Sequence, residues 1–151
     1  MSRWFALAAL AVAVSACSDS TGPSSQITLS QIAGSWDLSR VEMLLAADTS
    51  VHQDVTAMLG GARISLNINR DGAGILVVAA VGQVPDSTRV AISLHGDTLV
   101  FSAEGAGTDY VVNVKIAGPS MSWRGLKTTS WDLDNDGSPE TVYERDTWRR
   151  P

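Results

Sequence analysis

The residues of this chain best spaced to bind a metal ion lie in one acidic loop near its end. The four carboxylates of this acidic loop are Asp132, Asp134, Asp136 and Glu140. The first three occupy alternate positions, and Gly137 follows them. Alternate oxygen ligands followed by a glycine that permits a sharp bend match the opening of a calcium loop. The loop departs from an EF-hand at the twelfth position, where Tyr143 replaces the bidentate glutamate.

Two interpretations of the acidic loop remain open. In one, calcium relieves the repulsion between the four carboxylates and stiffens the last hairpin without reacting. In the other, the loop is a plain hairpin turn, because Asn, Asp and Gly tolerate positive φ. Calcium is the only cofactor that the sequence suggests.

Catalytic residues are scarce elsewhere in the chain. Its two histidines are His52, on the polar side of a short expected helix, and His95, in a His-Gly-Asp turn. The sequence contains no Gly-x-Ser-x-Gly elbow, no His-Glu-x-x-His pair and no phosphate-binding glycine loop. Without a base, a nucleophile or an open metal site, we expect a protein that is not an enzyme.

The first residues have the composition of an export signal. Arg3 precedes an apolar run from Trp4 to Ala16, which is too short for a permanent transmembrane helix. The run ends at Cys17, the only cysteine, and residues 14–17 (Val-Ser-Ala-Cys) resemble the bacterial lipobox. That resemblance implies cleavage before Cys17 and lipid attachment to its sulfur. Ser18 after the cysteine implies passage to the outer membrane of the cell envelope.

The sequence therefore divides into three parts. Residues 1–16 are the expected signal peptide, residues 17–26 a lipidated cysteine with a flexible polar tether, and residues 27–151 a folded domain. The formal charge is −5, and removal of Arg3 with the leader makes it −6. An acidic domain with scattered basic residues is a poor binder of phosphate backbones, so nucleic acid is not an expected partner.

Short β-branched runs separated by turn residues dominate the folded domain. Residues 63–69 alternate apolar and polar side chains, as a half-buried strand does, and a glycine-containing turn at 70–72 follows. Further strands are expected at 36–45, 74–81, 90–94, 98–103, 110–116, 121–132 and 140–150. About eight strands in hairpin order predict an all-β, antiparallel up-and-down barrel, with a sandwich as the alternative.

Two segments predict a short helix near each end of the barrel. Leu29–Ile32 fits one helical turn, and Val51, Val55, Met58 and Leu59 fall at helical spacing. Ser50 and Gln53 are positioned to cap the second helix, and Gly60 is positioned to end it. This second helix either covers the barrel mouth as a lid or plugs that end.

The start of the folded domain resembles a known family. Gly34, Ser35 and Trp36 are similar to the Gly-x-Trp signature on the first strand of lipocalins and related calycin barrels. In those families an arginine near the chain end packs across this tryptophan. Arg149 and Arg150 both stand in the right place, and strand parity does not choose between them. The resemblance is closest to the lipocalin-like domains of bacterial lipoproteins.

Two functions from different classes fit this pattern. The first is an envelope-anchored binding module whose aliphatic inward rows, such as Ile64–Ile68 and Val90–Leu94, surround a small apolar molecule. The second is a structural or protein-interaction module with a solid barrel. Trp123, Trp131 and Trp148 would then form a partner-binding surface patch, unless they pack in the core. An interior cavity near 300 Å³ is the observation that would favour the first function.

Overall fold

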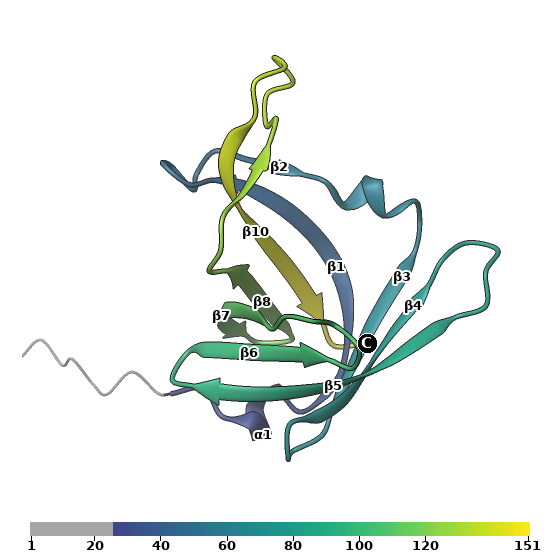
Figure 1. The fold of residues 1–151 in the computed structure, drawn as a ribbon. Helices are drawn as coiled ribbons and strands as arrows, with labels where there is room; N and C mark the ends of the chain where they lie inside the picture. The colour runs from purple at the N-terminus through teal and green to yellow at the C-terminus, as the bar shows by residue number, and fades with distance from the viewer. Residues whose placement is uncertain (1–25) are drawn as a thin grey trace, which may run out of the picture.

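Antiparallel strands make up most of residues 26–151, the part of the chain described by the structure, a computed structural model (Figure 1). The strands are β1 (Gly34–Leu45), β2 (His52–Asp54), β3 (Arg63–Ile68), β4 (Ala73–Ala79), β5 (Asp86–His95), β6 (Thr98–Ala103), β7 (Tyr110–Ala117), β8 (Ser120–Gly125), β9 (Thr129–Trp131) and β10 (Glu140–Arg149). The helical elements are α1 (Leu29–Ile32) and the 3-10 helix η1 (Thr56–Leu59). Eight strands, in the order β1-β3-β4-β5-β6-β7-β8-β10, close into a barrel because β10 pairs back with β1. The predicted up-and-down barrel is confirmed, and the sandwich alternative is wrong.

The two strands outside the barrel, β2 and β9, pair with those ends of β1 and β10 that reach beyond it. The start of β1 pairs with β3, and its end pairs with β2, from Glu42 opposite Asp54 to Leu44 opposite His52. Similarly, β10 pairs with β9 through its first residues and with β8 through its last. A shift of register between Leu38 and Arg40 bends β1 where the barrel gives way to this extension.

The core lies inside the barrel and follows the predicted alternation. Leu66, Ile68, Val90 and Ile92 are buried, and Ile64 and Leu94 pack against them. The inward-facing rows named from the sequence are therefore confirmed. All buried residues of this core cluster lie between Ile32 and Trp148, so residues 26–151 contain a complete closed barrel with its own core.

The end of the barrel near α1 is closed by the residues that carry the lipocalin-like signature. Trp36 is fully buried, and its Nε1 donates a hydrogen bond to the Ile32 carbonyl at 2.7 Å. The guanidinium carbon of Arg150 lies 4.4 Å from the Trp36 ring centre, whereas within residues 26–151 the side chain of Arg149 makes no cation–π contact. Gly34 has a φ of +123°, and a Cβ there would lie 2.6 Å from Arg150 Nη1. Of the two candidate arginines, Arg150 therefore makes the predicted contact, and Gly34 leaves room for it.

Two predicted elements differ from the structure. The single strand predicted over 121–132 is two strands, β8 and β9, separated by residues 126–128. The helix predicted over 51–59 is strand β2 followed by η1, and the buried side chain of Val55 lies between them. Pairing with the end of β1 gives the backbone N–H and C=O groups of residues 52–54 hydrogen-bond partners, whereas one isolated helical turn is costly to nucleate. Gly60 ends η1, as predicted for the helix.

The 3-10 helix η1, which replaces the second predicted helix, lies next to the barrel cavity. Leu59 contacts the barrel cavity, but Met58 is 66% exposed and η1 contains no buried residue. The 3-10 helix therefore lies beside the cavity and contributes Leu59 to its lining. Of the two short helices expected near the barrel ends, α1 is confirmed, and η1 takes the place of the other as a single 3-10 turn.

The predicted export and anchoring segments lie almost entirely outside the described residues. The leader (residues 1–16), Cys17 and residues 18–25 of the tether belong to this part of the chain. Within residues 26–151, the helices are too short to cross a bilayer.

Candidate functional site

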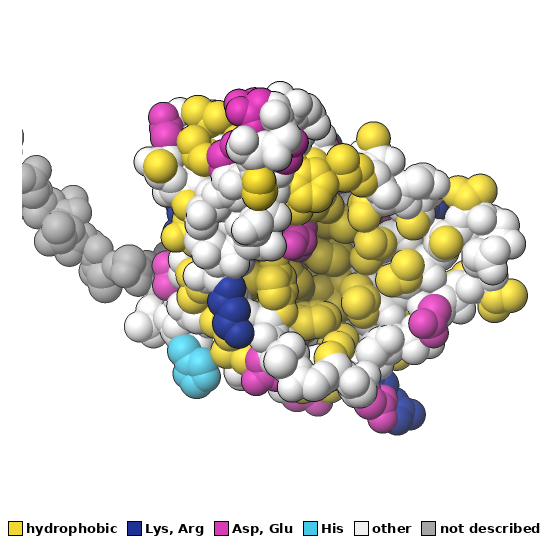
Figure 2. All heavy atoms as spheres, turned by 45° about the horizontal axis from the view of Figure 1, so that its top comes forward, with side chains coloured by type: hydrophobic (Ala, Val, Ile, Leu, Met, Phe, Trp, Pro, Cys, Tyr) yellow, Lys and Arg dark blue, Asp and Glu magenta, His cyan; other side chains and the backbone are white. Residues whose placement is uncertain are grey.

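The barrel interior contains an open, largely apolar cavity of about 250 Å³. Figure 2 shows it as a hollow lined by hydrophobic side chains, at the end of the barrel away from α1. Its lining residues are Leu38, Val41, Leu59, Ile64, Leu76, Phe101, Tyr110, Trp123, Glu144, Asp146 and Trp148. The volume is slightly below the 300 Å³ expected for a binding barrel, so the cavity has room for one small molecule.

Three aromatic rings in contact form one wall of this cavity. The ring centres of Phe101 and Trp123 are 5.7 Å apart, and those of Trp123 and Trp148 are 5.0 Å apart, both pairs being tilted. Trp123 and Trp148 are each only 3% exposed, and neither indole Nε1 has a hydrogen-bond partner among residues 26–151. Tilted aromatic packing fixes these rings, so the wall is rigid.

The opposite chemistry comes from β10, which places two carboxyl groups among the apolar side chains. Glu144 and Asp146 stand two residues apart and therefore share the inward face of the strand with Val142 and Trp148. Asp146 is only 8% exposed. Burial, repulsion from Glu144 and a hydrogen bond shared with Glu144 raise the pKa of Asp146 to about 7. The carboxyl of Asp146 is therefore close to half-protonated at neutral pH.

Tyr110 adds a polar group to the same cavity. Within the described part of the chain its buried hydroxyl has no hydrogen-bond partner, and Gly125 leaves room for it, because a Cβ there would lie 3.3 Å from the oxygen. Burial and the carboxyls of Glu144 and Asp146 raise the pKa of Tyr110 above its ordinary value. The phenol therefore stays neutral and keeps its proton available for donation.

The second buried carboxylate of the barrel, Glu42, has a different environment on the outer face of β1. It is 2% exposed, its Oε2 accepts a hydrogen bond from Arg145 Nε at 2.8 Å, and Arg145 Nη2 lies 2.8 Å from the same oxygen in an ion pair. Arg40 Nη2 lies 3.3 Å from its other oxygen, and His52 Nε2 lies 3.5 Å from it. The charge of Glu42 is thus compensated by protein cations.

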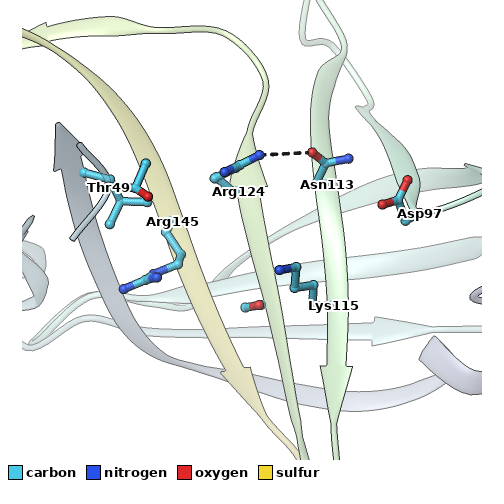
Figure 3. A pocket seen from close by; sticks show the side chains of 8 residues that line it. Thr49, Asp97, Asn113, Lys115, Arg124 and Arg145 are labelled. Atoms are coloured by element: carbon cyan, nitrogen blue, oxygen red, sulfur yellow. Dashed lines mark hydrogen bonds between the residues drawn. The ribbon is translucent and has the colours of Figure 1, made fainter. Parts of the chain in front are cut away.

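A groove of about 330 Å³ runs along the outer wall beside this cluster (Figure 3). Lys115, Arg124 and Arg145 reach it from β7, β8 and β10, and Asp97 borders it. Arg145 is held by Glu42, and Arg124 lies 5.6 Å from the Tyr143 ring centre and 3.4 Å from Asn113 Oδ1. Most of the positive charge in this groove therefore already has a protein partner.

The structure brings together the four carboxylates of the acidic loop. One oxygen from each of Asp132, Asp134, Asp136 and Glu140 can be chosen so that all four lie within 4.8 Å of one another, an arrangement that could hold a metal ion. Carboxylates of this loop also accept backbone hydrogen bonds, including Gly137 N to Asp132 at 2.9 Å and Leu133 N to Glu140 at 2.7 Å. Asn135 and Gly137 adopt positive φ, so the loop also has the geometry of a plain turn.

The tryptophan surface patch that would serve a protein partner is not present. Trp123 and Trp148 belong to the core cluster. Trp131 is half-buried, and its Nε1 donates to Gln53 Oε1 at 2.8 Å, which joins β9 to β2. The prediction of core packing is confirmed for two of the three residues, and the patch interpretation is wrong for them.

Glu144 and Asp146, the most distinctive residues of the site, were not predicted from the sequence. The signal was available, because alternate residues of a strand share a face, and this face begins with Val142 and ends with Trp148. Two acids between such apolar neighbours indicate buried carboxyls. Conversely, His95 is an exposed residue at the end of β5, as expected of a solvated turn residue.

No family model, curated protein or solved structure matches this chain. The likeness to calycin barrels therefore rests on the closed eight-stranded barrel and on the contact between Trp36 and Arg150.

Proposed function

We propose that this chain is a lipocalin-like binding module of the bacterial envelope that holds one small, mostly apolar molecule inside its barrel. The observation that carries the proposal is the open interior cavity of about 250 Å³. The interior of an eight-stranded barrel is either filled by side chains or wide enough to hold one small ligand. Nine of its eleven lining residues are aliphatic or aromatic. Binding, rather than catalysis, is the role that this lining favours.

A pair of tryptophan variants on one strand tests the use of the cavity. Leu76 lines it, whereas Ile75 is 49% exposed on the other face of β4. We expect Leu76→Trp to abolish the binding of octanol, measured by calorimetry, and Ile75→Trp to leave it unchanged. Native mass spectrometry of protein extracted from its own membranes should also show a retained small molecule. If octanol does not bind the parent barrel and no molecule is retained, the solid-barrel alternative, a structural or protein-interaction module, is correct.

The envelope location is supported by the sequence around Cys17. An export signal followed by a lipobox-like segment gives a membrane anchor of two or more acyl chains, which is the number that stable anchoring needs. The expected result is that the protein sediments with outer membranes and that the mass of its N-terminal peptide includes the lipid on Cys17. Cys17→Ser should release the protein from this fraction, and a lipid-free Cys17 with Met1 retained would contradict the proposal.

The acidic loop is proposed as a structural calcium site. Four carboxylates whose oxygens come within 4.8 Å of one another repel, and a divalent cation removes that repulsion. Calcium should raise the melting temperature of the parent relative to a chelator, because an ion that binds only the folded state stabilises it by mass action. Asp134→Asn should lose most of this increase, while Asp86→Asn, on exposed β5, should retain it. Equal melting temperatures with and without calcium would leave the plain turn as the explanation.

A further inference from the structure

We propose that the molecule held in the barrel carries a protonated amine that lies against the carboxyl pair of Glu144 and Asp146. The inference rests on the proposed binding function and names the chemical class of the ligand. Its starting point is the charge of the cavity. Two carboxyls line it, and no Lys, Arg or His among the described residues does.

The two buried carboxyls, Glu42 and Asp146, differ in whether a protein cation lies beside them. Glu42, on the outer face, has Arg145, Arg40 and His52 within 4 Å. Asp146, on the inner face of the neighbouring strand, forms no ion pair with any residue in the range 26–151. Since a buried charge is stable only when it is paired or neutralised, Asp146 needs either a proton or a cation from outside the protein.

The described side chains around the carboxyl pair are neutral or form no ion pair with it. Tyr110, which faces it from β7, is neutral, and Trp123 and Trp148 contribute indole rings. Lys127 borders an adjoining pocket that Glu144 and Asp109 also line, but it forms no ion pair with either carboxylate. The cavity is therefore negative when both inward carboxyls are ionised, and none of its lining residues between 26 and 151 carries a positive charge to offset it.

The aromatic wall favours the same class of ligand. The faces of Trp and Phe rings attract cations, by about 0.5–2 kcal/mol depending on desolvation. An amine that donates hydrogen bonds to the carboxyls beside Trp148 would also lie near these rings, while its apolar part packs against Leu38, Ile64 and Leu76. A carboxylate ligand would be repelled by Glu144, and an alcohol would leave the charge of the pair uncompensated.

Binding of such a cation must displace a proton from the pair. In the free protein at about pH 6, Asp146 holds a proton because its pKa is about 7. A bound ammonium group stabilises the ionised carboxyl, so that proton leaves to the buffer. An alkylamine, like a lysine side chain with a pKa of about 10.4, stays protonated throughout this range.

Calorimetry with three ligands of equal chain length tests the inference on the barrel, residues 26–151, which the structure shows to be closed with its own core. Octylamine should bind about tenfold more tightly than octanol at about pH 8, and octanoate more weakly than octanol. Octylamine affinity should fall by a similar factor at about pH 6, where binding should release close to one proton, whereas octanol affinity should not change.

Matched double variants separate the carboxyl pair from overall charge. In Glu144→Gln/Asp146→Asn, octylamine should lose its advantage over octanol, and octanol should bind as before. In Glu104→Gln/Asp86→Asn, which removes the same charge from exposed positions, the advantage should remain. Equal affinities of octylamine and octanol in the parent would overturn the inference but leave the proposed function intact. Failure of all three ligands to bind would overturn both.

Discussion

Arg150 covers the indole of Trp36, with its guanidinium carbon 4.4 Å from the ring centre. Arg150 Nη2 also donates hydrogen bonds to the carbonyls of Gln31, at 3.0 Å, and Ala33, at 3.2 Å. One residue at the chain end thus closes the barrel floor, supports α1 and fixes the start of β1. The contact ties β1 to the residue that follows β10, the strand whose pairing with β1 closes the barrel.

Removal of this contact should destabilise the barrel. We expect Arg150→Met to lower the free energy of unfolding by about 1–2 kcal/mol, because it removes a cation–π contact and two hydrogen bonds to carbonyls. Urea denaturation measures the change. Arg149→Met is the matched control, since Arg149 is also exposed but has no cation–π contact within residues 26–151, and it should cost less than about 0.5 kcal/mol. Equal effects of the two substitutions would contradict the structural role of Arg150.

The ion cluster around Glu42 predicts a larger effect on the outer wall. Glu42→Gln should lower the free energy of unfolding by about 2 kcal/mol, because it leaves Arg145 and Arg40 without their shared buried carboxylate. Glu104→Gln, which breaks an exposed pair with Arg89 at 3.9 Å, should change stability by less than about 0.5 kcal/mol. Guanidinium unfolding curves of the two variants, recorded together, give the comparison. A Glu42→Gln variant as stable as the parent would show that the cluster contributes nothing.

Asp146 predicts an unusual dependence of stability on pH. Its pKa is raised from 3.8 to about 7 on folding, so the native state binds more protons between these values, and the stability of the fold falls as pH rises through that window. Asp146→Asn removes this penalty. The variant should be more stable than the parent at about pH 8, by up to about 4 kcal/mol, and the difference should shrink towards zero near about pH 3.

Denaturation curves across this pH range check the prediction for Asp146. Asp86→Asn, at an exposed position on β5, serves as the control and should follow the parent at every pH. An Asp146→Asn variant that is less stable than the parent at high pH would mean that the ionised carboxyl has a stabilising partner in the cavity.

The local pattern of apolar and polar residues predicted much of the fold. Alternation along residues 63–69 and 90–94 depends only on which side chains prefer to be buried, and β3 and β5 follow it. The hairpin turns follow from Gly and Asp at fixed positions. The segment at 51–59 was wrong because its apolar spacing fits a helix, whereas pairing with the distant end of β1 offers the backbone more hydrogen bonds.

The residues of the candidate site were harder to predict from local sequence patterns. The acidic loop was found because its ligands are close in sequence, and the structure does bring their oxygens together. Glu144 and Asp146 were missed because a carboxyl is normally a surface group, and only their apolar neighbours on one strand face indicated otherwise.

By itself, the sequence determined the all-β class, the strand order, the Trp36 signature and the grouping of the acidic loop, because each depends on residue type and short spacing. Tertiary structure alone decided that β10 meets β1, that Arg150 rather than Arg149 covers Trp36, and that an open cavity remains between the rings and the carboxyls. Strand register and the volume left between side chains depend on residues far apart in the chain, and no local pattern contains that information.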